Sequence, residues 1–149
     1  MEAEEWPVWA MDQAERFVPA TLLGYVQEWP FQPLPKGYRQ MKQGACFRNA
    51  AILVQRDPSL CYCEGVAGPI VSDLVPHAWA VDQNGRVIDP TWCRRHEGKR
   101  YFGIPLTTEW IFETARESGH GGESLRMLAR RIKEDPSAIC QWIKRERLI

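Results

Sequence analysis

The middle of the chain carries the spacing of an amphipathic helix. Four apolar residues recur at positions i, i+3, i+4 and i+7, which places them on one helical face. They are Phe47, Ala50, Ala51 and Val54. We expect this helix to begin at Cys46 and to end at Asp57, because Pro58 disfavours helical backbone in the residue before it.

Three short runs after this helix have the composition of β-strands. We expect them at Cys61 to Ala67, at Val75 to Asp82 and at Arg86 to Asp89. The last two runs flank Asn84-Gly85, a dipeptide that is typical of tight turns between antiparallel strands. The sequence therefore predicts a β-hairpin at this point.

The length of the hairpin loop decides which side chains share a face. A two-residue loop would pair Ala80 with Asp89, and His77 and Asp89 would then lie on opposite faces of the hairpin. A three-residue loop, residues 83–85 with its glycine in the left-handed region, would pair Trp79 with Asp89 instead. His77 and Asp89 would then be diagonal neighbours within side-chain reach. The dipeptide permits either loop.

Both ends of the chain are expected to be helical. One helix is predicted from about Asp12 to Gln27, broken or kinked near Pro19. The proline-rich run after it, up to residue 40, should be an extended arm over the core. Beyond residue 106 the expected elements are a helix capped by Thr107 or Thr108, an amphipathic helix over 125–132 and a last helix over 136–143.

These elements together predict one α+β domain, residues 1–149. The helix that carries the cysteine is expected to pack on a small antiparallel β-sheet, with helical segments N-terminal and C-terminal to them. The zones are a Pro/Trp-rich N-terminal arm and helix (1–40), a catalytic core (41–106) and C-terminal helices packed on the core (107–149). A chain of this length can bury a core of its own.

The composition argues against several classes of function. Lysines plus arginines equal aspartates plus glutamates, 19 of each, so no overall charge attracts the chain to nucleic acid or to an anionic membrane. No run approaches the roughly 18 apolar residues of a membrane span, and the acidic start lacks the features of a signal peptide. We therefore expect a cytoplasmic protein that binds neither membrane nor nucleic acid.

The chain contains five cysteines, and a reducing cytoplasm predicts that all of them are thiols. Cys61 and Cys63 are two residues apart, so they face the same side of a strand. With only three histidines and no second cysteine pair, this spacing does not predict a metal site. We expect these two cysteines to be core residues, and we expect no metal or other cofactor.

The candidate chemistry lies in Cys46, His77 and Asp89. They place a cysteine at the start of a helix, a histidine in a strand and an aspartate at the end of the next strand. A thiolate is the attacking species, and the positive end of a helix dipole favours it. Gly44 permits a sharp turn and the close approach of a substrate. The aspartate would orient the imidazole, which would accept the thiol proton.

Each of these residues also has a purely structural interpretation. Cysteine often serves as a small buried hydrophobe. Histidine within a strand is often structural, and an aspartate before Pro-Thr commonly closes a strand with a turn. Asn49, one helical turn after Cys46, is expected to brace the turn or a neighbouring strand rather than to take part in chemistry.

An acyl-transfer site also needs hydrogen-bond donors for the negative oxygen that develops on the substrate. The backbone N–H of Cys46 is one candidate donor, and the side chain of Gln40 or of Gln43 is another. Trp79 is expected to pack beneath the site and to exclude water. Trp79 and Trp92 are the aromatic candidates for binding substrate.

Four motifs, read in order, resemble the transglutaminase-like branch of the papain-like cysteine hydrolase superfamily. They are C-F-R-N-A, Y-C-E-G, H-A-W and V-I-D-P-T-W, between Gln40 and Leu106. Small, mostly uncharacterised bacterial and phage proteins carry similar motifs. The resemblance implies Cys46 as nucleophile, His77 as base and Asp89 as orienting residue, in a peptidase, amidase, deamidase or acyltransferase that acts on a protein, peptide or other amide. No calcium-site pattern such as D-x-D-x-D-G is present, so calcium-dependent cross-linking is not expected.

Two alternative functions follow from the same sequence. The superfamily includes members that have lost catalysis, which implies a catalytically inactive binding protein. The basic segment L-R-M-L-A-R-R-I-K-E-D-P-S-A-I-C-Q-W resembles the helix-turn-helix of small phage-type repressors, which implies DNA binding. Lys133 stands where that motif usually has glycine, so we expect a helical pair packed on the core instead.

Overall fold

The computed structural model describes residues 8–69, 74–92, 99–118 and 124–144. Their strands form one antiparallel sheet in the order β1-β5-β2-β3-β4. The strands are β1 (Gln27–Trp29), β2 (Cys61–Pro69), β3 (Val75–Val81), β4 (Val87–Ile88) and β5 (Lys99–Leu106). The helices are α1 (Val8–Phe17), the 3-10 helix η2 (Ala20–Tyr25), α2 (Cys46–Arg56), α3 (Thr108–Ser118), α4 (Ser124–Glu134) and α5 (Ala138–Trp142). Helices combined with an antiparallel sheet confirm the predicted α+β class.

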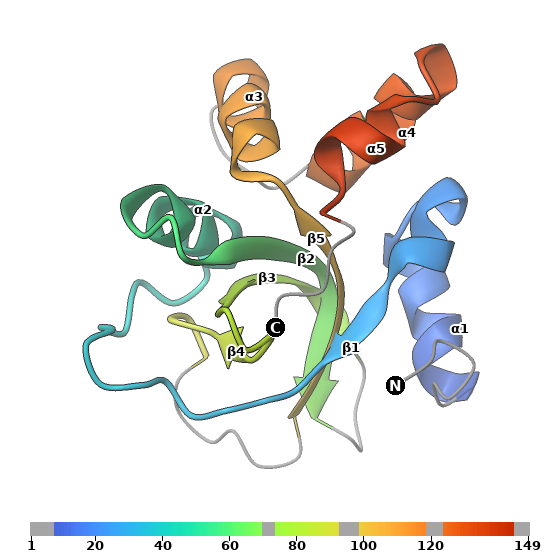
Figure 1. Cartoon of the computed structure of the whole chain (residues 1–149). Coiled ribbons are helices and arrows are strands. Elements are labelled where there is room, and N and C mark those ends of the chain that lie inside the picture. Colours follow the sequence, from blue (N-terminus) through green and yellow to red (C-terminus); the bar gives the residue numbers. More distant parts are fainter. Residues whose placement is uncertain (1–7, 70–73, 93–98, 119–123, 145–149) are drawn as a thin grey trace.

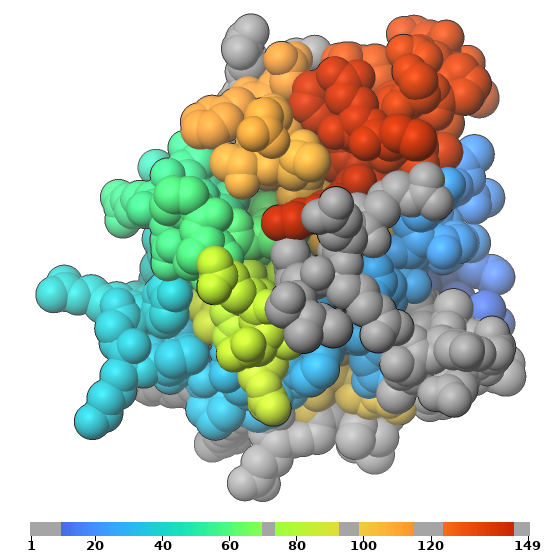
Figure 2. Space-filling view, in the orientation of Figure 1, coloured from blue at the N-terminus to red at the C-terminus, as the bar shows by residue number. Residues whose placement is uncertain are grey.

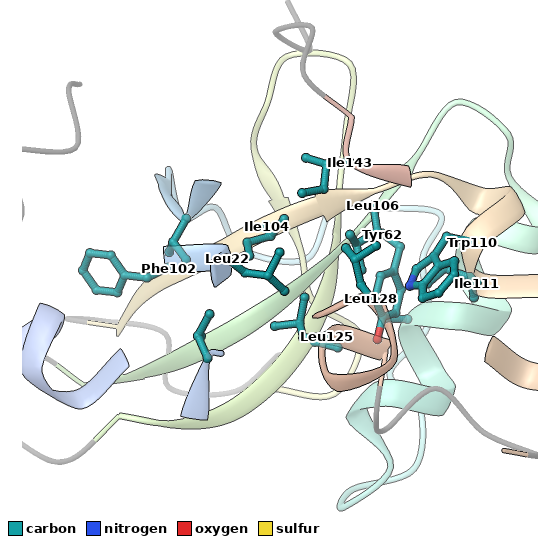
Figure 3. Packing of buried hydrophobic residues seen from close by; sticks show 14 of the residues in the cluster. Leu22, Tyr62, Phe102, Ile104, Leu106, Trp110, Ile111, Leu125, Leu128 and Ile143 are labelled. Atoms are coloured by element: carbon teal, nitrogen blue, oxygen red, sulfur yellow. The ribbon is translucent and has the colours of Figure 1, made fainter. Parts of the chain in front are cut away.

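The main core lies between the curled sheet and the helices around its outer side (Figure 1). On β5, Phe102, Ile104 and Leu106 point to this side and are fully buried. Figure 3 shows these three side chains in a row along the strand, together with Leu22 and Leu125 from the helical layer. Each fully buried side chain of this size contributes roughly 1.5–3 kcal/mol, so this layer is a major source of stability.

A second apolar cluster lies on the opposite face of the sheet. It contains Trp29, Trp79, Val81, Val87 and Tyr101, which come from β1, β3, β4 and β5. The Trp29 Nε1 donates a hydrogen bond of 3.0 Å to the carbonyl oxygen of a residue on β5. Both faces of β2 and β5 are therefore buried, which gives these strands continuous rather than alternating burial.

The N-terminal helix predicted from Asp12 to Gln27 is wrong in its extent, whereas the break predicted near Pro19 is confirmed. Helix α1 ends at Phe17, because Pro19 has extended backbone with ψ of 140° and cannot continue a helix. Gln27 is the first residue of β1, which pairs with β5. The segment after β1 passes along β4 before it reaches α2. Figure 2 shows the blue and cyan atoms of this segment beside the yellow-green atoms of the β3–β4 hairpin.

Strand β5 lies between β1 and β2 in the sheet, yet its hydrophobic pattern does not reveal it. Gly103 and Pro105 interrupt the run, and both residues are uncommon inside strands. The packing explains the glycine, because a Cβ at position 103 would lie 2.6 Å from the ring of Trp79. The tryptophan on β3 therefore requires a residue without a side chain on β5.

The C-terminal helices pack on the main core. Leu128 of α4 and Ile143, just after α5, are buried, and Ile143 forms an isolated β-bridge with Leu106. The rings of Trp110 and Trp142 lie 5.2 Å apart. None of the described helices is long and apolar enough to cross a membrane. Residues 1–7 and 145–149 of the predicted domain, and Cys93 among the five cysteines, lie outside the described residues.

Candidate active site

The register of the β3–β4 hairpin brings His77 and Asp89 together. Val81 pairs with Val87, and the same register, continued, places Trp79 opposite Asp89. This is the register of the three-residue loop, one of the two alternatives that the sequence permits. The prediction that this loop makes His77 and Asp89 diagonal neighbours is confirmed, since their side chains are hydrogen-bonded.

The turn itself selects the longer loop. Gly85 has φ of 76°, in the left-handed region that glycine adopts without strain. The Asp82 carboxylate accepts hydrogen bonds from the backbone N–H groups of Asn84 (2.9 Å) and Arg86 (3.0 Å). The backbone of Asp82 is also bonded to those of Gly85 and Arg86. An aspartate before the turn therefore fixes the register on which the candidate site depends.

His77 and Asp89 form a buried pair. The His77 Nε2 lies 2.8 Å from the Asp89 Oδ2, and the side chains are 1% and 4% exposed. Burial by itself would lower the pKa of His77, but the hydrogen bond with Asp89 and the interaction with Cys46 outweigh it and raise that pKa. Burial would raise the pKa of Asp89, but the hydrogen bonds from His77 and Tyr101 lower it instead. Both shifts favour an imidazolium beside a carboxylate.

Four donors hold the Asp89 carboxylate in place. Its Oδ1 accepts the backbone N–H groups of Thr91 (3.0 Å) and Trp92 (3.1 Å). Its Oδ2 accepts the Tyr101 hydroxyl (2.7 Å) in addition to the imidazole of His77. A carboxylate with this many donors stays ionised although it is buried, and its orientation is set before any substrate binds.

Cys46 is the first residue of α2 and is half-buried. Gly44, with φ of 79°, makes the turn into the helix. Ala45 occupies the N-cap position and has no side-chain oxygen, so no capping bond competes for the N–H groups of the first turn. Cys46 also contributes to the raised pKa of His77, which indicates that its thiol lies near the ring. Because Asp89 uses the Nε2 of that ring, Nδ1 is the nitrogen left for the sulfur.

Aromatic rings enclose the imidazole of His77. The ring of Trp92 stacks on it with centroids 3.6 Å apart and planes at 13°. Trp79 lies further below, at 6.0 Å, and Tyr101 packs edge-on against Trp79 at 5.0 Å. Trp79 has no exposed surface, so it occupies the position of a packing residue. Trp92 is partly exposed, with the Lys99 ammonium 4.9 Å from the centre of its ring, and its role in binding substrate stays a prediction.

A small polar network ties the start of α2 to the loop after Asp89. The buried Asn49 amide donates to the Lys42 carbonyl (2.8 Å) and to the Thr91 hydroxyl (2.9 Å). The Gln43 amide donates to the Thr91 carbonyl. The predicted bracing role of Asn49 is confirmed. The network holds the cysteine helix and the aspartate loop in one arrangement.

The structure places the two candidate oxyanion glutamines on the segment before α2. One amide hydrogen of Gln43 is donated to the Thr91 carbonyl oxygen, so a contact with the substrate oxyanion would use the second amide hydrogen. Gln40 is exposed. The backbone N–H of Cys46 lies at the uncapped helix start described above. The oxyanion roles of all three groups stay predictions.

Two buried polar residues near the site escape prediction from the sequence. Tyr101 reaches Asp89 from β5, the strand that the hydrophobic pattern does not reveal. Glu64 lies in β2 and accepts the Tyr62 hydroxyl (2.6 Å) and the Leu125 N–H (3.3 Å). Burial raises the pKa of Glu64 to about 7. In the sequence it stands out only as the charged residue of the Y-C-E-G motif, between apolar positions of a strand.

Cys61 and Cys63 are buried thiols, which confirms the core role predicted for them. Burial raises the pKa of Cys61 to about 11, and burial also raises the pKa of Cys63. In the part of the chain that the structure describes, no group of three or more His, Cys, Asp or Glu side chains could hold a metal ion.

Fold and site together define an α+β protein with a buried His-Asp pair beside a cysteine at a helix start. Comparisons with protein-family models, with curated proteins and with solved structures found no match.

Proposed function

We propose that the protein is an acyl-transfer enzyme with Cys46 as nucleophile, His77 as base and Asp89 as orienting residue. The observation that carries the proposal is the position of His77, whose Nε2 is hydrogen-bonded to Asp89 and whose pKa is also raised by Cys46. A nucleophile, a base and an orienting group in series are the elements that thiol catalysis needs. The substrate class is a protein, a peptide or another amide.

The reaction begins with transfer of the Cys46 thiol proton to His77. The thiolate attacks the carbonyl carbon of the amide, and the negative oxygen is stabilised by donors at the start of α2. The C–N bond then breaks, the amine leaves with the proton from His77, and the acyl group stays on sulfur as a thioester. Water or a second amine attacks the thioester, gives its proton to His77 and releases the acyl product together with the free thiol.

The cysteine helix supports this assignment in two ways. Cys46 is the first residue of α2, so the uncapped N–H groups of the first turn lie near it and can serve as donors to the substrate. The helix also packs on β3, the strand that carries His77, so the two groups belong to one packed unit. This arrangement of a cysteine helix on an antiparallel sheet is the one expected of the transglutaminase-like branch.

The test is the rate of alkylation of each cysteine by iodoacetamide, followed by peptide mass spectrometry. Cys46 should react fastest at neutral pH. Cys61 and Cys63 should be slow, because burial raises the pKa of both thiols. His77→Ala should remove the fast phase, and a Cys140→Ser variant, which alters an exposed thiol, should retain it.

Two results would contradict the proposal. One is that Cys46 reacts no faster than the exposed Cys140, and the other is that His77→Ala leaves the rate at Cys46 unchanged. If alkylation is fast but an amide library yields no thioester and no released amine, the protein is the catalytically inactive binding protein of the alternative interpretation.

A further inference from the structure

A pocket of about 230 Å³ opens on the helical face of the sheet. We call it the Glu64 pocket. The lining residues used below are Arg16, Phe17, Phe47, Glu64, Pro76 and Arg126. Since a water molecule occupies about 30 Å³ of liquid, the pocket has room for one amino-acid side chain and part of its backbone.

The Glu64 pocket lies near the start of the cysteine helix. Phe47, the residue after Cys46 in α2, lines the pocket. Pro76 of β3 lines it as well, whereas the side chain of the next residue, His77, points to the opposite face of the sheet. The hydroxyl of Tyr62, which binds Glu64, is close enough to Cys46 for the charge of the cysteine to contribute to its raised pKa, after the larger effects of burial and of Glu64. A ligand in this pocket would therefore lie near the start of α2, the helix that begins with the proposed nucleophile.

Two arginines give the rim of the pocket its charge. Arg16 comes from α1 and Arg126 from α4, and both are exposed. Among the described residues neither guanidinium forms a salt bridge. Two unpaired guanidinium groups from separate elements, facing one pocket, suit an anionic group that accepts hydrogen bonds from both.

The remaining walls narrow the choice of anion. Glu64 lines the same pocket and is only 5% exposed, so in its ionised form it would repel a doubly charged phosphate more strongly than a carboxylate. The Glu64 oxygens can accept a hydrogen bond from an amide N–H of the ligand. Phe17, which is 45% exposed, and Phe47 offer apolar surface to a carbon stem.

We propose that the Glu64 pocket binds an acidic side chain of the acyl substrate, with its carboxylate at Arg16 and Arg126 and a backbone amide toward Glu64. This inference rests on the proposed function, because it assigns a preference to the substrate that Cys46 attacks. The preferred substrates are peptide-type amides with an aspartate or glutamate next to the reacting acyl group.

The test compares three chloroacetyl probes on the full chain. They are the N-chloroacetyl derivatives of glutamic acid α-amide, of glutamine α-amide and of phosphoserine α-amide. In each reaction the Cys46 thiolate displaces chloride and an S–C bond forms, so saturation of the labelling rate reports binding. The glutamyl probe should saturate at about five- to tenfold lower concentration than the uncharged glutaminyl probe, since two exposed ion pairs contribute modestly. The preference should weaken as salt is added.

Matched variants locate the preference. Arg16→Gln and Arg126→Gln should each reduce it, and the double variant should abolish it. Arg130→Gln, which alters an exposed arginine of α4 outside the pocket lining, should leave it unchanged. All three substitutions are at exposed positions, so the fold should persist, which circular dichroism checks.

The small neutral reagent 2-chloroacetamide separates the two proposals. If it labels Cys46 no faster than the exposed Cys140, the proposed function fails and this inference falls with it. If it labels Cys46 rapidly but the glutamyl and glutaminyl probes react alike, the pocket assignment is overturned while the proposed function stands. Stronger labelling by the phosphoseryl probe would also overturn the choice of a carboxylate.

Discussion

Replacing Glu64 by Gln should remove a pH dependence from the stability of the protein. Burial raises the pKa of Glu64 to about 7 from 4.5, although hydrogen bonds from Tyr62 and Leu125 act in the opposite direction. Between these two pH values the folded protein keeps a proton that the unfolded chain has lost. Each pH unit in this window therefore lowers the free energy of unfolding by about 1.4 kcal/mol.

Between pH 4.5 and about pH 7 the free energy of unfolding therefore falls by about 3 kcal/mol in total, and it falls no further through this group above pH 7. This contribution is fully present below pH 4.5 and disappears as the pH rises through about 7. Urea unfolding followed by tryptophan fluorescence, at several pH values from 4 to 8.5, measures it. The difference in the free energy of unfolding between the wild type and Glu64→Gln should change by about 3 kcal/mol between pH 4.5 and about pH 7.

The difference between the two proteins isolates Glu64, because other titrating groups such as His77 and Asp89 are common to both. The absolute stability of Glu64→Gln will also shift, since a carboxamide cannot accept at both positions that Tyr62 and Leu125 occupy. That cost does not depend on pH. Glu15→Gln, at an exposed position of α1, serves as the control. Parallel curves for the wild type and Glu64→Gln would refute the reasoning.

Three further substitutions test other parts of the structure. Asp89→Asn should lower the alkylation rate or turnover at Cys46 by a factor on the order of 10²–10⁴, because an amide supports the wrong tautomer of the imidazole. Tyr101→Phe removes one donor from a buried carboxylate and should cost roughly 1–3 kcal/mol in urea unfolding. Gly65→Ala should destabilise by about 3 kcal/mol or more, or prevent folding, because its Cβ would overlap the Phe102 carbonyl oxygen; yield of soluble protein and urea unfolding measure this.

The local part of the candidate site could be predicted from the sequence. His77 and Asp89 are 12 residues apart on one hairpin, and the turn sequence permits only two registers for that hairpin. The backbone of Gly85 and the side chain of Asp82 select one of them. The face shared by His77 and Trp79 follows from strand alternation alone. The contact between His77 and Asp89 could therefore be predicted, because it depends only on the geometry of one hairpin.

The long-range part could not be predicted. The contact of Tyr101 with Asp89 depends on β5, and Gly103 hides that strand because its missing side chain makes room for a ring on another strand. The Glu64 carboxylate meets the N–H of Leu125, a residue 61 positions away. Such contacts depend on how elements pack in three dimensions, and no periodicity along the chain encodes them.

The hydrogen bonds around Asp89 also determine which nitrogen of His77 can accept a proton. A carboxylate cannot donate, and the pKa of Asp89 is lowered by its partners against the effect of burial, so it stays ionised. The hydrogen between the two side chains must therefore sit on Nε2 of His77. In the neutral imidazole the accepting nitrogen is then Nδ1, the one left for Cys46. The Tyr101 hydroxyl and the hairpin register thus orient the proposed base. The remaining requirement is that α2 places the sulfur of Cys46 near Nδ1 of His77.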